Sequence, residues 1–160
     1  MLAIGAVVVL VDQLTKAWAV NSLQGQPPVE VIGTLLQWSF ATNSGAAFSF
    51  GSGSTWVFTI FATIIIAAVL YVTPKVTNRW WAVSLGLILG GGAGNLIDRI
   101  FREPGIGQGH VIDFIRVPNW PVFNIADMAV VTGAILAVLL SLKGIDYREV
   151  PDAADAEASV

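Results

Sequence analysis

Long runs of apolar residues recur along the chain and are separated by short polar segments. The runs cover residues 2–20, 55–73, 80–98 and 122–142. Their only charged residues are Asp12 and Lys16 in the first run, Asp98 at the end of the third and Asp127 in the fourth, and none of the runs shows strand-like alternation. Each approaches the ~20 residues that a helix needs to cross a bilayer. Because only helices and closed barrels satisfy their backbone in lipid, the pattern predicts four transmembrane helices.

The composition supports a membrane protein. Of 160 residues, 55% are hydrophobic and 12% are charged, whereas a soluble domain carries roughly 25% charged residues. We therefore expect a membrane all-α bundle that forms one domain over residues 1–145. The acidic residues 146–160 are typical of a disordered tail. The first run lacks the basic start and the clear cleavage site of a signal peptide, so we expect it to be a mature helix.

The segments between the runs predict further structure on one side of the membrane. Within residues 28–50, apolar Leu36, Trp38 and Phe40 alternate with smaller or more polar residues, which predicts a strand. A turn at 43–45 and a second strand over 46–50 would complete a small β-element. The glycine- and proline-rich residues 101–121 predict a loop, with a short helix around 110–117.

The positive residues near the helix ends favour one orientation. Lys75, Arg79, Lys143 and Arg148 lie on one side, and Lys16, Arg99, Arg102 and Arg116 on the other. The counts are equal, but Lys16 and Arg102 each have an acidic residue four positions earlier as a possible partner. The positive-inside rule then puts both termini in the cytoplasm and the β-element outside.

Two aspartates lie in apolar sequence. Asp113 and Asp127 would each cost about 2.5–3.5 kcal/mol at membrane depth, and such residues usually mark a function. Two of them suggest a carboxylate pair that shares one proton and activates a water molecule. With no cysteine and a single histidine, thiol chemistry and a zinc site of the His-Glu-x-x-His kind are excluded. A net charge of −3 predicts no nucleic-acid surface.

Each polar site also has a purely structural explanation. Asp127 follows Asn124 at the spacing of a capping box. Asp98 and Arg102 have the spacing of a surface ion pair that ends the third helix. Arg116, three residues after Asp113, is a possible partner for that carboxylate.

Small residues recur on the third helix. Gly86, Gly90 and Gly94 are spaced every fourth residue, which lets either another helix or an acyl chain approach closely. Both explanations stay open, and helix packing is favoured for Gly86.

Five motifs point to one family. They are Asp12-Gln-Leu-Thr-Lys16, Asn43-Ser-Gly-Ala-Ala-Phe48, Gly94-Asn-Leu-Ile-Asp-Arg99, Val111-Ile-Asp-Phe114 and Phe123-Asn-Ile-Ala-Asp127. In this order they closely resemble the signature boxes of the bacterial lipoprotein signal peptidase (signal peptidase II) family. The resemblance extends from Val11 to Leu142. A departure is Met128, where the family often has serine.

The resemblance implies an aspartyl endopeptidase of the bacterial inner membrane that needs no metal or cofactor. Such an enzyme removes the signal peptide of prolipoproteins before a cysteine that carries a diacylglyceryl group, and its active site lies near the outer leaflet. Asp113 and Asp127 would be its catalytic dyad, and we expect the protein to act as a monomer in contact with membrane lipid. The supporting residues implied by the resemblance are Asp12, Lys16, Asn43, Gly94, Asn95, Arg99 and Asn124. Since Asp127 lies near a helix N-terminus, we expect it to be the initially ionised base.

Two other classes of protein remain as alternatives. A small proton-coupled transporter or channel would also bury acidic residues, but it would more often show inverted repeats and broken helices, and no such repeat is visible. A structural subunit would need neither aspartate.

Overall fold

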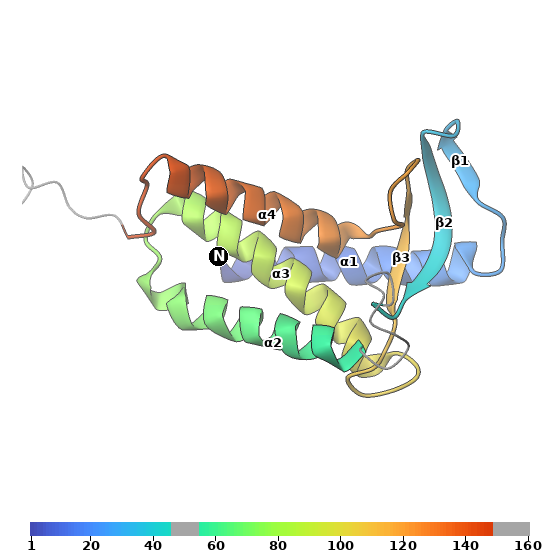
Figure 1. Ribbon diagram of the computed structural model, residues 1–160, viewed down its shortest axis with the longest axis horizontal. Coiled ribbons are helices and arrows are strands. Elements are labelled where there is room, and N and C mark those ends of the chain that lie inside the picture. The colour runs from blue at the N-terminus through green and yellow to red at the C-terminus, as the bar shows by residue number, and fades with distance from the viewer. Residues whose placement is uncertain (46–54, 149–160) are drawn as a thin grey trace, which may run out of the picture.

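The computed structural model describes residues 1–45 and 55–148 and forms a helical bundle with a small sheet across one end (Figure 1). The helices are α1 (Leu2–Leu23), α2 (Thr55–Val72, followed by the 3-10 turn η2, Thr73–Lys75), α3 (Arg79–Phe101) and α4 (Ile125–Leu142). Each of these helices is long and apolar enough to cross a membrane. The predicted membrane all-α bundle of four transmembrane helices is confirmed.

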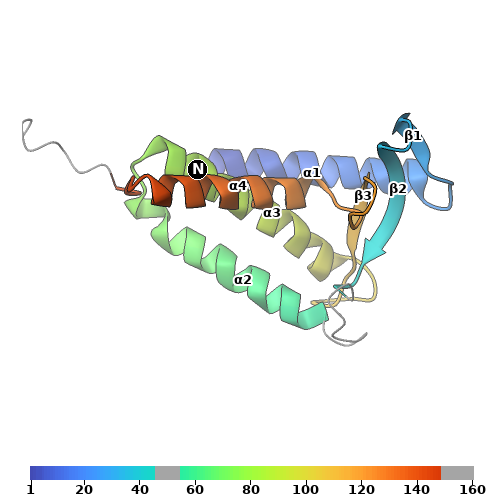
Figure 2. The ribbon, with the colours of Figure 1, turned by 45° about the horizontal axis from the view of Figure 1, so that its top comes forward.

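Helix α3 lies at the centre of the bundle and packs against the other three helices. Helix α2 packs mainly against α3, and it diverges from α1 and α4 toward the sheet end (Figure 2). A groove lined by residues of α2, α3 and α4 lies beside this divergence.

The glycines of α3 allow close helix packing. A Cβ atom on Gly90 would lie 2.6 Å from the Cβ atom of Val8 in α1. A Cβ atom on Gly94 would lie 2.6 Å from the Oδ2 atom of Asp12. Because these neighbours already fill the space, the acyl-chain explanation is wrong for Gly90 and Gly94.

The sheet has three antiparallel strands in the order β1-β2-β3. They are β1 (Val29–Ile32), β2 (Leu36–Asn43) and β3 (Val111–Arg116). The strand predicted from the alternation at 36–40 is confirmed, and so is the small β-element. The predicted return strand at 46–50 and most of the predicted tail, residues 149–160, lie outside the described residues.

The short helix predicted around 110–117 is wrong, because this segment forms β3. Five of its six residues are buried, so both faces are covered and the sequence shows no alternation. Its pairing partner β2 is far away in sequence, with Asp113 opposite Ala41. Local sequence cannot reveal such a long-range pairing.

Helix α4 begins at Ile125, three residues later than predicted. Phe123 instead forms an isolated antiparallel bridge with Ile115. Asn124 then caps the helix, and its side chain accepts a hydrogen bond from the Asp127 backbone N–H at 2.9 Å. This late start places Asp127 in the first turn, beside the sheet.

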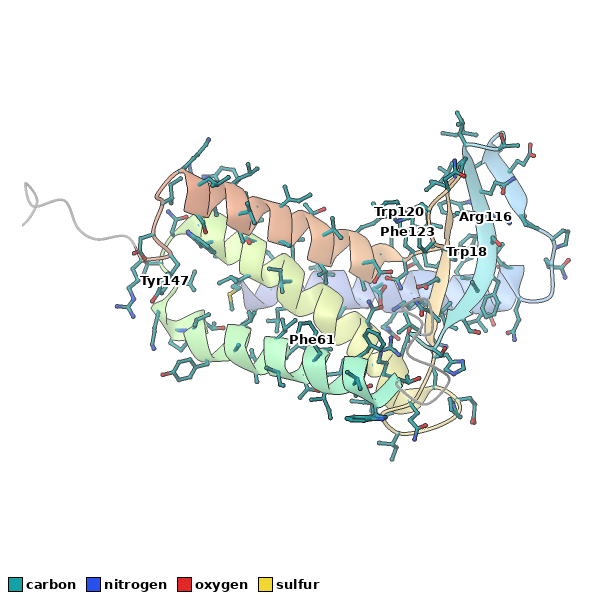
Figure 3. All side chains as sticks on the ribbon, viewed as in Figure 1. Trp18, Phe61, Arg116, Trp120, Phe123 and Tyr147 are labelled. Carbon is teal, nitrogen blue, oxygen red and sulfur yellow. The ribbon has the colours of Figure 1, made fainter. Side chains whose placement is uncertain are left out.

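An apolar cluster fixes the sheet to the end of α1. Ala19 and Leu23 of α1 are buried against Ile112 and Phe114 of β3. The ring of Trp18 lies 6.0 Å from that of Phe114 in an edge-to-face arrangement, a geometry that stabilises aromatic pairs. Figure 3 shows Trp18 at the sheet end of the molecule. β3 therefore has a fixed position above the helix ends.

Candidate active site

Asp113 on β3 and Asp127 in α4 are joined through two asparagine side chains. Asn124 Nδ2 donates to Asp113 Oδ1 at 2.6 Å, and Asn95 Nδ2 donates to Asp127 Oδ1 at 2.8 Å. Asn124 Nδ2 also approaches Asn95 Oδ1 at 3.2 Å. Asn124 is fully buried and Asp113 is 2% exposed. The two predicted catalytic carboxylates therefore belong to one hydrogen-bonded network.

The end of β2 supplies the second donor to Asp113. Asn43 Nδ2 donates to Asp113 Oδ2 at 3.0 Å, and Asn43 Oδ1 accepts the Gly45 backbone N–H at 2.8 Å. Gly45 has φ +88°, a conformation that favours glycine, and a Cβ atom there would lie 2.6 Å from the Phe58 ring. The turn predicted at 43–45 thus orients Asn43.

The capping explanation for Asp127 is correct but incomplete. Its Oδ2 atom accepts the Asn124 backbone N–H at 3.2 Å, which completes the capping box. Its Oδ1 atom is bound by Asn95 of α3, which a simple cap would not require. Asp127 is also only partly buried and lines a groove.

A charged cluster formed by Asp12, Lys16, Asp98 and Arg102 lies next to the network. Lys16 Nζ is 2.8 Å from Asp12 Oδ2 and 2.9 Å from Asp98 Oδ2. Arg102 Nε is 2.7 Å from Asp98 Oδ1. Both predicted i, i+4 pairs are therefore present. The surface explanation is wrong for Asp98, because its side chain is completely buried.

The possible pairing of Asp113 with Arg116 is also wrong. Arg116 is exposed at the end of β3 and forms no salt bridge with any residue that the structure describes. Asp113 and Arg116 both lie in β3. Because residues three apart on a strand point to opposite faces, these two side chains cannot face each other.

An apolar groove of about 300 Å³ leads to Asp127. It lies between α2, α3 and α4 and is lined by Phe58, Phe61, Ala62, Ile65, Ile88, Gly92, Asn95, Arg99, Asp127, Val130 and Val131. Its polar residues, Asn95, Arg99 and Asp127, belong to the C-terminal part of α3 and the first turn of α4. Phe61, which Figure 3 labels, lies on α2. The buried guanidinium of Arg99 lies 5.6 Å from the Phe58 ring centroid.

Two smaller cavities reach the same carboxylates. One of about 170 Å³ is lined by Trp120, Phe123, Asp127, Met128 and Val131. The other, of about 240 Å³, is lined by Ala41, Thr42, Asn43, Ser44, Asp113, Pro121 and Val122. Figure 3 shows Trp120 and Phe123 beside the start of α4. Asp127 therefore lines two of the three cavities, and Asp113 lines the third.

The arrangement suits acid–base chemistry without a metal ion. Among residues 1–45 and 55–148, no group of three or more histidine, aspartate or glutamate side chains could hold a metal. Two carboxylates in one network can share a proton, since one can remain protonated while the other is ionised.

Most of the chain matches one known protein family. The family model described as signal peptidase (SPase) II matches residues 4–143. The chain belongs to the signal peptidase II family. The resemblance predicted from the five motifs, and with it the predicted enzyme family, is confirmed.

Curated relatives carry the same family name, and a solved membrane enzyme shares the fold. A lipoprotein signal peptidase of Mycolicibacterium smegmatis is 49% identical over 94% of this chain, which spans 64% of that protein. One of Mycobacterium avium is 48% identical, and the chain spans 82% of its length. A solved bacterial membrane enzyme is 33% identical with a TM-score of 0.78, covering 88% of this chain and 91% of its own.

Three features of this candidate site were not predicted from the sequence. Gly92, not Gly90 or Gly94, lines the groove. Phe58 and Phe61 of α2 also line the groove, but in sequence they are indistinguishable from lipid-facing residues. Asp98 is a member of the charged cluster, and a signal for this was available, since it lies within the Gly94–Arg99 motif.

The buried Asp113 predicts a pH-dependent stability. Burial first, and the charge of Asp127 second, raise the pKa of Asp113 to about 6 from 3.8. A raised pKa means that the folded chain binds this proton more tightly than the unfolded chain does. The protonated Asp113 therefore adds on the order of 3 kcal/mol to the free energy of unfolding. This contribution is complete below about pH 4 and is lost as the pH rises through about 6.

Unfolding of wild type and Asp113→Asn, measured from pH 4 to 8 in one detergent, checks this prediction. The asparagine cannot titrate, so the stability difference between the two proteins should change across pH 4–6.5 and stay constant above it. Parallel stability curves would contradict the raised pKa.

Proposed function

We propose that this chain is an aspartyl endopeptidase of the bacterial cytoplasmic membrane. It removes the signal peptide of prolipoproteins just before a cysteine that carries a diacylglyceryl group, and it acts as a monomer. The observation that carries the proposal is the network joining Asp113 and Asp127 at the polar end of an apolar groove. Membership of the signal peptidase II family supports this substrate class.

In the proposed mechanism, Asp113 holds the shared proton and Asp127 is ionised. The raised pKa of Asp113 supports this assignment. Asp127 takes a proton from water while the water oxygen bonds to the scissile carbonyl carbon, and protonated Asp113 polarises the carbonyl oxygen. When the C–N bond breaks, Asp113 gives its proton to the leaving amine. The pair then again holds one proton, now on Asp127, and transfer to Asp113 completes the cycle.

The groove suits the lipid part of this substrate. Its walls are almost wholly apolar and come from membrane-spanning helices, so an acyl chain can lie between α2 and α4. Asn95 and Arg99 at its polar end can donate hydrogen bonds to ester or peptide oxygens. The supporting residues of the proposed site are Asp12, Lys16, Asn43, Gly94, Asn95, Arg99 and Asn124.

The proposed orientation places both termini in the cytoplasm and the sheet at the outer leaflet. Lys75, Arg79, Lys143 and Arg148 lie near the end opposite the sheet. At the sheet end, Lys16 and Arg102 are in ion pairs and Arg99 is buried. Because these positive charges are paired or buried, they argue less strongly against the proposed orientation under the positive-inside rule.

A cleavage assay tests the proposed function. The full chain in liposomes is incubated with a prolipoprotein peptide, either carrying the diacylglyceryl group on its cysteine or bearing the free thiol. We expect cleavage before the cysteine in the modified peptide and much slower cleavage of the unmodified one. An intact modified peptide would refute the proposal.

A further inference from the structure

The charged cluster makes direct contacts with the backbone beside both carboxylates. Asp98 Oδ2 accepts the backbone N–H of Ile112, the residue before Asp113, at 3.2 Å. Asp12 Oδ1 accepts the backbone N–H of Ala126, the residue before Asp127, at 3.0 Å. One buried carboxylate therefore holds the strand that carries Asp113, and the other holds the helix start that carries Asp127.

Lys16 joins these two contacts. Its ammonium group has three donors, and three acceptors surround it: Asp12 Oδ2 at 2.8 Å, Asp98 Oδ2 at 2.9 Å and Asn95 Oδ1 at 2.9 Å. All its hydrogen-bonding capacity is thus used within the protein. Lys16 has no donor left for a substrate, so its role is to hold other groups.

Stability alone does not account for the cluster. The side chains of Asp12, Lys16 and Asp98 are 0% exposed. The desolvation cost of such buried charges often equals or exceeds their mutual attraction, and apolar replacements can be as stable. Buried ionic groups can instead hold other groups in fixed positions, because charge-assisted hydrogen bonds are short and directional.

We propose that Asp98 and Asp12, bridged by Lys16, are positioning residues that set the separation of Asp113 and Asp127 by holding the backbone amides of Ile112 and Ala126. The proposal rests on the proposed function and extends it to Asp98. A carboxylate pair needs a defined spacing for one water molecule, and a displacement of about 1 Å can cost about 10²-fold in rate.

Amide hydrogen exchange tests the contacts without any substrate. In the full chain in detergent micelles, Asp98→Ala should speed exchange of the Ile112 amide at least tenfold and leave the Ala126 amide close to wild type. Asp12→Ala should speed exchange of the Ala126 amide to the same extent and leave the Ile112 amide close to wild type. Unaltered exchange at the matching amide in either variant would overturn the proposal.

Kinetics tests the consequence for catalysis. Asp98→Ala should lower kcat about 10–10²-fold and change KM less than about threefold. Asp98→Asn retains an oxygen that can accept the Ile112 amide, so it should recover both part of kcat and part of the protection from exchange. An Asp98→Asn variant no better than Asp98→Ala in either measurement would overturn the role of this hydrogen bond.

Ser84→Ala is the matched control. Ser84 is a buried polar residue of α3 whose Oγ donates to the Gly133 carbonyl of α4 at 2.7 Å, about four turns from Asp98. It should lower the melting temperature without lowering kcat, and an equal loss of kcat in Ser84→Ala and Asp98→Ala would overturn positioning. A wild type that cleaves nothing would refute the proposed function instead, while the exchange measurement would still decide the contacts.

Discussion

Asp113→Asn and Asp127→Asn are each expected to lower the cleavage rate at least about 10²–10⁴-fold while the protein remains folded and inserted. An asparagine cannot take a proton from water or give one to the leaving amine. The double variant should be little worse than either single variant, because groups that act as a unit are not additive. Initial rates with the diacylglyceryl-modified peptide measure the effect.

The control for this experiment is Asp146→Asn. Asp146 is exposed after the C-terminal end of α4, so the same chemical change there should leave cleavage at the wild-type rate. Asp113 Oδ1 and Oδ2 both accept hydrogen bonds from asparagine side chains. The amide nitrogen of an asparagine at 113 would therefore face one of these N–H donors in place of an acceptor. Each variant therefore needs a melting curve beside its rate. Near wild-type cleavage by either single variant would exclude the dyad.

The features predictable from sequence are those with a local pattern. The four helices follow from apolar runs about 20 residues long, and the Lys16–Asp12 pair follows from i, i+4 spacing. The capping box at Asn124 and Asp127 is likewise a local signal. Spacing along the chain is therefore sufficient to predict that Asp127 lies at a helix start.

The position of Asp113 was not predictable in the same way. β3 is buried on both faces and pairs with a strand about 70 residues earlier, so neither periodicity nor a neighbouring hairpin partner identifies it. Its apolar context and the resemblance to a family both singled out Asp113, but only the sheet explains its partners. Asn43 and Asn124 reach it from β2 and from the start of α4.

Charge spacing misled the interpretation of Asp98. A carboxylate four residues before an arginine at a helix end is usually a solvated pair, and Arg102 does pair with it. The additional contact to Lys16 joins α3 to α1, and it exists because the glycines of α3 let the two helices approach closely. Burial of Asp98 is therefore a consequence of tertiary packing, which spacing along one helix cannot reveal.

Gly92→Leu is expected to lower kcat/KM at least about tenfold, mainly by raising KM, in a protein that remains folded. A Cβ atom at this position would lie 3.4 Å from Ile66 Cγ1, an ordinary van der Waals distance. The remaining carbon atoms of leucine would occupy the groove that Gly92 lines. If an acyl chain of the substrate lies there, the two compete for the same space.

The matched control for Gly92→Leu is Gly92→Ala, which adds only the tolerated Cβ atom and should cleave at nearly the wild-type rate. Both substitutions replace a glycine inside α3 with a better helix former, so a loss seen only with leucine cannot come from a weakened helix. The neighbouring Gly91 gives the contrasting result, because its Cβ atom would clash with the Ala126 carbonyl and Gly91→Ala should impair folding. Melting curves and kcat/KM with the modified peptide separate these outcomes, and a wild-type kcat/KM in folded Gly92→Leu would exclude this groove as the lipid site.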